Sequence, residues 1–254
     1  MKNYDVLLVN DDGFEAQGLV MLREELRKAG LSVFTFAPLC EKSASAHSLS
    51  VKRDLKLVKI SDDIYALDGT PSDCVAVALG HFCRAKYILS GINRGANMSE
   101  DATYSGTLGA CMEAALRGIP SLGLSQFMGK ADFTRSARLS AKLLQHFIAS
   151  PARLREREFI SVNFPASELD FKGFKLCGMG RRHYRFKYLK KMHHDEIYFR
   201  FSESEYEFEA WPGSDLEAVH SGFASITPIH LNLASSDSLK TLAGIDDDIN
   251  RQVF

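Results

Sequence analysis

Short apolar runs alternate with longer amphipathic stretches over the first two-thirds of the chain. The run Val6–Val9 is typical of a strand buried on both faces, and Leu19, Leu22 and Leu26 recur at helical spacing before Gly30. The pattern predicts further strands at 33–37, 55–60, 64–67, 87–89, 122–124 and 159–164, and further helices from 70, from 105 and from 132. Strands that alternate with helices form parallel βαβ units, so the predicted fold is α/β, an open and mostly parallel sheet with helices on both faces.

The pattern changes near residue 172. The stretch 172–194 holds eight Lys or Arg residues and no acid, whereas 195–217 holds eight acids and one basic residue, Arg200. Polar and apolar residues alternate at period 2 within both stretches, which predicts a β-ribbon whose opposite charges pair across the strands. A solvated hairpin, an oligomer contact and a rim around a substrate site are the open interpretations. A last strand is expected at Ser225–Leu233.

Composition narrows the classes of function. The 254 residues carry 31 basic and 32 acidic side chains, a formal net charge of −1. A near-neutral charge argues against a dedicated binder of nucleic acid or of acidic membranes. No stretch approaches the ~20 apolar residues of a membrane helix, and five scattered cysteines, mostly among apolar residues, are typical of reduced thiols. We therefore expect a soluble cytoplasmic protein.

Two adjacent carboxylates, Asp11 and Asp12, follow the first predicted strand. Ligands of open parallel sheets bind outside the carboxyl ends of the strands, which makes this position a candidate site. Neighbouring carboxylates repel each other and lose hydration there, so a cation should offset them, and Mg²⁺ or Mn²⁺ prefers such oxygen ligands. An ordinary Asp-Asp-Gly turn is an equally good interpretation of this motif alone.

Two more loops are expected at the same edge of the sheet. Ser90–Asn97 follows a strand and offers amide side chains and two glycines that permit close approach to a ligand, with a self-capping polar loop as the alternative. Ser105-Gly106-Thr107 precedes a helix, whose first N–H groups bind anions such as phosphate, although an ordinary N-cap has the same signature. A carboxylate pair and an anion-binding helix start at one edge together indicate metal-assisted phosphoryl chemistry.

Other motifs fit their context less well. Cys111 and Arg117 have the spacing of cysteine-dependent phosphatases, but the residues between them favour a helix, which cannot wrap a phosphate. Adjacent His193 and His194 are more typical of a surface than of zinc ligands, and the acidic stretch 246–248 is typical of a frayed end. His47, in the serine-rich loop 39–50, is equally compatible with a functional role and with a loop filler.

Taken together, these motifs resemble the SurE family over nearly the whole chain. The resemblance is carried by Leu8–Gly13, the loop from Ala37 to Ser48, Gly69–Cys74, Ser90–Asn93, Tyr104–Thr107 and Ser225–Pro228. The family implies a Rossmann-like three-layer fold with a protruding β-hairpin and an extended C-terminal segment that is exchanged between subunits. On this basis we expect one domain over 1–254, with a hairpin extension at 181–222 and a C-terminal segment at 223–254.

The resemblance also implies site residues. Asp11 and Asp12 would be metal ligands, either of them able to orient or deprotonate the attacking water, and Ser43 and Asn93 would complete the ligand set. Ala44 stands where the family has a glycine, so Ser45 is the alternative serine ligand. By the helix-start argument, Ser105, Gly106 and Thr107 would hold the phosphate, and Asn97 is a candidate for a further contact.

The implied activity is that of a 5′-nucleotidase, which hydrolyses nucleoside monophosphates to nucleoside and phosphate with one divalent metal ion, Mg²⁺ or Mn²⁺, per subunit. Further candidate substrates are 3′-nucleotides and short polyphosphate. We expect a homodimer or homotetramer, with neither nucleic acid nor membrane as partner. The alternatives are a nucleotide- or metal-binding sensor protein without turnover and a phosphatase with an aspartyl-phosphate intermediate, whose nucleophilic Asp usually stands in a D-x-D arrangement. A metal-dependent glycosyltransferase is a weaker third alternative.

Overall fold

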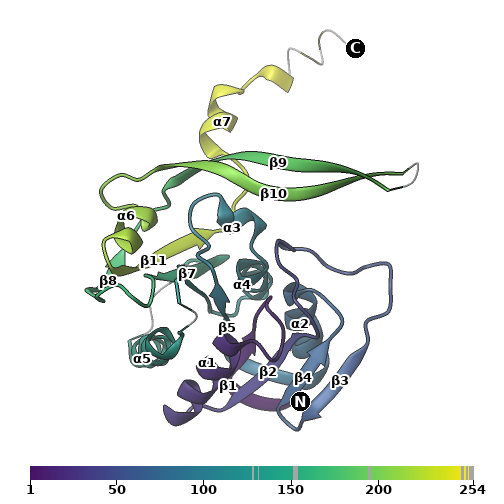
Figure 1. The fold of residues 1–254 in the computed structure, drawn as a ribbon, viewed down its shortest axis with the longest axis vertical. Helices are drawn as coiled ribbons and strands as arrows, with labels where there is room; N and C mark the ends of the chain where they lie inside the picture. The colour runs from purple at the N-terminus through teal and green to yellow at the C-terminus, as the bar shows by residue number, and fades with distance from the viewer. Residues whose placement is uncertain are drawn as a thin grey trace.

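The computed structural model describes residues 1–127, 129–130, 132–150, 154–193, 196–246, 249 and 251. These residues form a central sheet of nine strands in the order β3-β4-β2-β1-β5-β6-β7-β11-β8 and a separate ribbon of two strands (Figure 1). The strands of the sheet are β1 (Lys2–Val9), β2 (Val33–Pro38), β3 (Leu57–Ser61), β4 (Ile64–Leu67), β5 (Cys83–Arg94), β6 (Ser121–Gln126), β7 (Glu158–Phe164), β8 (Gly173–Leu176) and β11 (Phe223–His230). His194, interpreted above as a surface residue, and residues 247–248 of the acidic stretch lie outside the described residues.

The helices follow the predicted alternation. They are α1 (Gln17–Lys28), α2 (Pro71–Val77), α3 (Asp101–Tyr104), α4 (Gly106–Leu116), α5 (Thr134–Ala149), α6 (Asp215–His220) and α7 (Ser236–Thr241), with a π-helix at Ala78–Phe82 after α2. The predicted N-cap of α2 is confirmed, because the Thr70 side chain accepts from the Asp73 N–H and the Asp73 carboxylate accepts from the Thr70 N–H. None of the helices in the described part of the chain is long and apolar enough to cross a membrane.

The sheet is parallel through its centre. From β4 through β2, β1, β5 and β6 to β7, each strand pairs in parallel with the next, whereas β3 and β11 join the two ends of this series in antiparallel pairing. Parallel strands end at one edge, so the loops after β1, β5 and β6 meet there. The predicted open, mostly parallel sheet is confirmed.

Helices cover both faces of this sheet. Successive side chains of a strand point to opposite faces, and in β1 Leu8 packs in one buried cluster while Leu7 packs in another. The cluster around Leu8 includes Leu22 of α1 and Leu144 of α5. The cluster around Leu7 includes residues of α2 and α4. The protein therefore has the expected three layers, with the apolar core split between the two faces.

The hairpin is built from β9 (Arg181–His193) and β10 (Glu196–Glu209), which project past the edge of the sheet with α7 on their far side (Figure 1). The predicted pairing of opposite charges across the strands is confirmed at the base, where Arg181 and His183 lie 3.8 and 2.8 Å from the Glu209 carboxylate. The hairpin strands stop at Glu209, because α6 turns back and buries Leu216 against the body. The expected bounds of the whole extension, 181–222, stay a prediction.

Candidate functional site

A cavity of about 550 Å³ lies at the carboxyl ends of β1 and β5, a volume within the range of small-molecule sites. Six of the sequence-predicted site residues line it: Asp11, Asp12, Ser43, Asn93, Asn97 and Ser105. Segments that are far apart in the chain therefore contribute to one cavity. Gly106 and Thr107 do not line the cavity themselves and lie against Asp11 at the start of α4.

Asp11 is almost completely buried at the end of β1. Its carboxylate accepts a hydrogen bond of 2.6 Å from the Thr107 hydroxyl. Burial nevertheless raises the pKa of Asp11 to about 6, because the loss of hydration outweighs that hydrogen bond and the neighbouring charge of Asp12 adds to the effect. The ionised form of Asp11 is therefore disfavoured in this position.

Asp12 lies beside it in a less buried position. The backbone N–H of Arg94 donates to the Asp12 carboxylate over 3.3 Å, and burial raises the pKa of Asp12 despite this contact. In the part of the chain that the structure describes, Asp11 and Asp12 accept hydrogen bonds but form no ion pair. Two partly desolvated carboxylates in one cavity are a favourable place for a cation.

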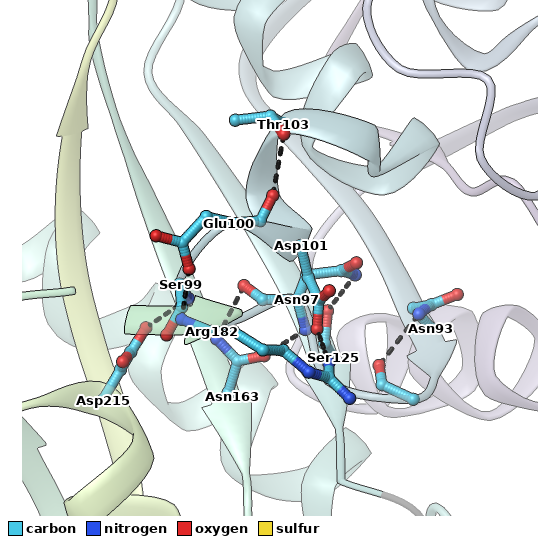
Figure 2. Close-up of polar contacts among 11 residues, drawn as sticks. Asn93, Asn97, Ser99, Glu100, Asp101, Thr103, Ser125, Asn163, Arg182 and Asp215 are labelled. Carbon is cyan, nitrogen blue, oxygen red and sulfur yellow. Dashed lines mark hydrogen bonds and ion pairs between the residues drawn. The ribbon is translucent and has the colours of Figure 1, made fainter. Parts of the chain in front are cut away.

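Neutral oxygen atoms complete the donor set. The Asn93 side-chain nitrogen donates to the Gly95 carbonyl over 2.8 Å (Figure 2), so its amide oxygen is the atom that it offers to a cation. The Ser43 hydroxyl donates to the Glu41 carboxylate over 2.6 Å, which leaves its oxygen lone pairs as acceptors. Among the described residues no group of three His, Cys, Asp or Glu side chains could hold a metal. Two carboxylates, an amide and a hydroxyl suit a hard cation such as Mg²⁺ or Mn²⁺.

The two candidate serine ligands of loop 39–50, Ser43 and Ser45, occupy different places. Ser43 lines the cavity, whereas the Ser45 hydroxyl is buried and has no hydrogen-bond partner among the described residues. A Cβ atom on Gly106 would come within 2.5 Å of the Ser45 hydroxyl oxygen, so Ser45 packs against the start of α4. Of the two alternatives, Ser43 is the serine that faces the cavity.

The start of α4 offers donors for an anion. Ser105 is the N-cap of this helix, and its hydroxyl oxygen accepts from the Leu108 N–H over 3.1 Å. The Thr107 hydroxyl is engaged with Asp11, so its proton is committed to that carboxylate. The Ser105 hydroxyl proton and the first N–H groups of the helix are the groups with which this end of α4 can hold a phosphate.

His47 connects loop 39–50 to the same helix. Its Nε2 atom lies 3.0 Å from the buried carboxylate of Glu113 on α4, and Arg117 binds the other oxygen of that carboxylate over 2.8 Å. The hydrogen bond from His47 lowers the pKa of Glu113. Two residues before Glu113 on the same helix, burial raises the pKa of the Cys111 thiol to about 12, which agrees with the rejection of a cysteine-phosphatase site.

Sequence reasoning missed several residues around Asn97. The Asn97 N–H donates to the Asn163 side-chain oxygen over 2.7 Å, and the Asn97 side-chain nitrogen donates to the Ser125 hydroxyl over 2.8 Å (Figure 2). Ser125 and Asn163 stand near the carboxyl ends of β6 and β7, so the strand-end rule could have found them. Asp101 also lines the cavity, and Arg182 of the hairpin binds it. No local sequence signal joins these last two residues.

Comparisons with known proteins give the family of the chain. The family model described as "Survival protein SurE" matches residues 6–186. A protein of Campylobacter concisus (strain 13826) named 5′-nucleotidase SurE is 42% identical over 251 residues, covering 94% of this chain and 97% of the relative. A Campylobacter lari protein of the same name is 38% identical over 247 residues, with 93% and 96% covered. The crystal structure of the SurE protein from Aquifex aeolicus superposes with a TM-score of 0.82 at 34% identity, covering 95% of this chain and 99% of that one.

Proposed function

Because the chain belongs to the SurE family, we propose that it is a metal-dependent 5′-nucleotidase, which hydrolyses nucleoside monophosphates to nucleoside and phosphate. The observation that carries the proposal is the placement of Asp11, Asp12 and the start of α4 around one cavity. The names of the relatives support the reaction class. The proposal extends to 3′-nucleotides and short polyphosphate as further substrates of the same phosphate site.

Asp11, Asp12, Ser43 and Asn93 would hold the cation, since their oxygen atoms line the cavity together. When bound, Mg²⁺ or Mn²⁺ would act as a Lewis acid and neutralise negative charge on the phosphate. In the proposed reaction the two carboxylates would also orient a water molecule for attack on phosphorus, opposite the departing ribose oxygen. Either Asp11 or Asp12 would accept the proton that this water loses.

The chain holds the phosphate through the start of α4. The Ser105 hydroxyl and the Gly106 N–H donate to its oxygens, and Thr107 serves this arrangement by fixing Asp11. Asn97 lies in the same cavity and is held by Ser125 and Asn163, so its orientation is set before a substrate binds. These contacts position the phosphorus relative to the carboxylates.

Phosphate release from a panel of 5′- and 3′-nucleoside monophosphates tests the proposal. The wild-type protein, Asp12→Asn and the matched control Asp62→Asn are each assayed with Mn²⁺, with Mg²⁺ and with EDTA. Asp62 is exposed, pairs with Lys59 and does not line the cavity. We expect release that EDTA abolishes, a loss of at least about a hundredfold in Asp12→Asn, and normal turnover in the control.

The same assay separates the alternatives. Full turnover in Asp12→Asn or in EDTA would exclude the proposed metal site. A covalent phosphoenzyme trapped on Asp11 or Asp12 would favour the aspartyl-phosphate mechanism. Nucleotide binding without phosphate release in either metal would favour a sensor protein.

The protein as proposed works as a homodimer or homotetramer in the cytoplasm. The hairpin carries exposed apolar side chains, among them Leu189 and Phe199, and large exposed apolar patches mark interaction surfaces. The exchange of the C-terminal segment between subunits stays part of this proposal. All five cysteines are free, and four of them are buried, which suits a reducing compartment.

A further inference from the structure

An arginine of the hairpin pairs with a carboxylate of the body that lines the cavity. Figure 2 shows Arg182 extending from the base of β9 toward Asp101, with Asn97 beside them. The Arg182 guanidinium forms an ion pair with the Asp101 carboxylate, and both side chains are less than one-fifth exposed. Asp101 lines the same cavity as Asp11 and Asp12. The cavity is thus lined by four carboxylates, those of Asp11, Asp12, Glu41 and Asp101, and Asp101 differs from Asp11 and Asp12 because it has a cationic partner.

The arginine is itself held on several sides. Its guanidinium lies over the ring of Phe208, its cross-strand partner, at 4.9 Å from the ring centre. Its backbone N–H donates to the Glu100 carboxylate. The Asp101 carboxylate is therefore clamped by a side chain whose own position is set by the ribbon and by the start of α3. Such a clamp fixes the direction in which the carboxylate offers its oxygens.

Anchoring of the hairpin alone does not require this ion pair. The base of the ribbon is already fixed to the body, because Asp215 of α6 accepts from the N–H groups of both Ser99 and Gly180 at 3.0 and 2.7 Å. A buried ion pair contributes little to the net stability of the fold, since each charge loses its hydration. Arg182 binds through one carboxylate oxygen, Oδ2, so Asp101 retains acceptor capacity toward the cavity.

The position of Asp101 relative to the phosphate site suits the sugar of a nucleotide. Asp101 precedes Ser105, the N-cap of α4, by one helical turn, and residues four apart along a helix have Cβ atoms about 5–6 Å apart. A phosphate at the start of α4 therefore places the atoms attached to it next to Asp101. Tyr104, which is half exposed, lines the same cavity and offers it an aromatic side chain. A carboxylate is a well-known acceptor for ribose hydroxyl groups in other nucleotide sites.

We propose that Asp101 is a specificity-determining residue that accepts hydrogen bonds from the sugar hydroxyls of the substrate, and that Arg182 is the positioning residue that orients it. The proposal rests on the nucleotidase function above and names the part of the substrate that this carboxylate recognises. It also explains the role of the hairpin base in the site: the hairpin supplies the cation that pairs with the largely buried Asp101 carboxylate in a cavity lined by three other carboxylates. A cation already in contact with Asp101 makes it a poor metal ligand, which separates it from Asp11 and Asp12.

Three substrates test the proposal in one assay: a ribonucleoside 5′-monophosphate, its 2′,3′-dideoxy analogue and p-nitrophenyl phosphate, which has no sugar. In the wild-type protein we expect the ribonucleotide to have the higher kcat/KM of the two nucleotides, by about tenfold to a hundredfold, the range for hydrogen bonds to a charged group. In Asp101→Asn this ratio falls toward one. The value of kcat/KM for p-nitrophenyl phosphate falls less than about threefold, which is a smaller loss than that for the ribonucleotide. Arg182→Gln shifts the ratio in the same direction, and Arg182→Lys restores part of it.

Arg181→Gln is the matched control, because the neighbouring Arg181 pairs with Glu209 on the ribbon and does not line the cavity. A second measurement needs no variant: adenosine should inhibit hydrolysis of p-nitrophenyl phosphate more strongly than 2′,3′-dideoxyadenosine. Equal inhibition by the two nucleosides, or an equal loss on all three substrates in Asp101→Asn, would overturn the proposal. Absence of hydrolysis of every substrate by the wild-type protein would instead contradict the nucleotidase function itself.

Discussion

Gly106 illustrates how individual residues determine the site. A Cβ atom at this position would come within 2.5 Å of the Ser45 hydroxyl oxygen and 2.9 Å of the Asp11 Cβ atom. Asp11 and the Ser45 backbone belong to different segments, and only a residue without a side chain lets both approach the start of α4. L-residues readily adopt the backbone conformation of Gly106, so the glycine is needed here for close approach and not for its backbone conformation.

We therefore predict that Gly106→Ala impairs catalysis more than folding. The added methyl group displaces Asp11 or loop 39–50, and a displacement of about 1 Å in a catalytic group can cost a hundredfold in rate. Overpacking of this size costs about 1–3 kcal/mol of unfolding free energy. Steady-state phosphate release and a urea unfolding curve measure the two effects. Gly80→Ala is the control, since a Cβ atom there meets nothing within 4 Å; equal activity of both variants would contradict the prediction.

At the scale of elements, loop 39–50 and helix α4 act as one unit. The contact of His47 with Glu113 joins them, and a Cβ atom on Gly109 would come within 2.2 Å of the Ala46 carbonyl oxygen. The loop carries Ser43, and the helix carries Ser105. The proposed cation site and the proposed phosphate site are thereby held at a fixed separation.

We predict that His47→Ala weakens Mn²⁺ binding about tenfold while the fold is retained. The loop loses its attachment to Glu113, so Ser43 is no longer held in place, and loss of such supporting contacts typically costs tenfold to a hundredfold in metal affinity. Isothermal titration with Mn²⁺ in the absence of substrate measures the change. The exposed His81, at the opposite end of the sheet, provides the control variant His81→Ala. Unchanged Mn²⁺ affinity in His47→Ala would show that the loop holds its shape without this contact.

At the scale of the whole molecule, the ribbon of β9 and β10 projects from the body and keeps apolar side chains exposed to solvent. Tyr188, Leu189, Phe199 and Phe201 are all more than half exposed, although they stand on a long two-stranded element that offers little burial by itself. A two-stranded hairpin is only marginally stable in water without a packing partner. A second copy of the chain is the partner that the proposed oligomer supplies.

We predict that the wild-type protein is a dimer or tetramer by light scattering, and that Leu189→Ser combined with Phe199→Ser lowers its molar mass by at least about half. The polar side chains remove the apolar area that drives association. Leu116→Ser, which changes an exposed leucine at the end of α4, should leave the mass unchanged. A monomeric wild-type protein would rule out the proposed assembly.

Local pattern was sufficient for most of the architecture. Alternating apolar runs and helical spacing predicted the parallel sheet and its helices. Apolar side chains that become buried recur periodically along the chain, so the pattern can be recognised in the sequence itself. The same holds for Asp11, Asp12 and Asn93, since the two aspartates closely follow β1, Asn93 stands at the carboxyl end of β5, and these strand ends meet at one edge. The short helix α3 and the end of the hairpin at Glu209 were not predicted, because each depends on packing against distant segments.

The contacts that tune the site come from elsewhere in the chain. Thr107 binds Asp11 across 96 positions, and Arg182 binds Asp101 across 81. Nothing in the residues around Arg182 distinguishes it from the other cations of its basic strand. The types of side chain at the sheet edge follow from local sequence, since they depend on where each strand ends. Their protonation, their orientation and their partners follow from the folded chain, because charge and burial act through space between residues that sequence order keeps apart.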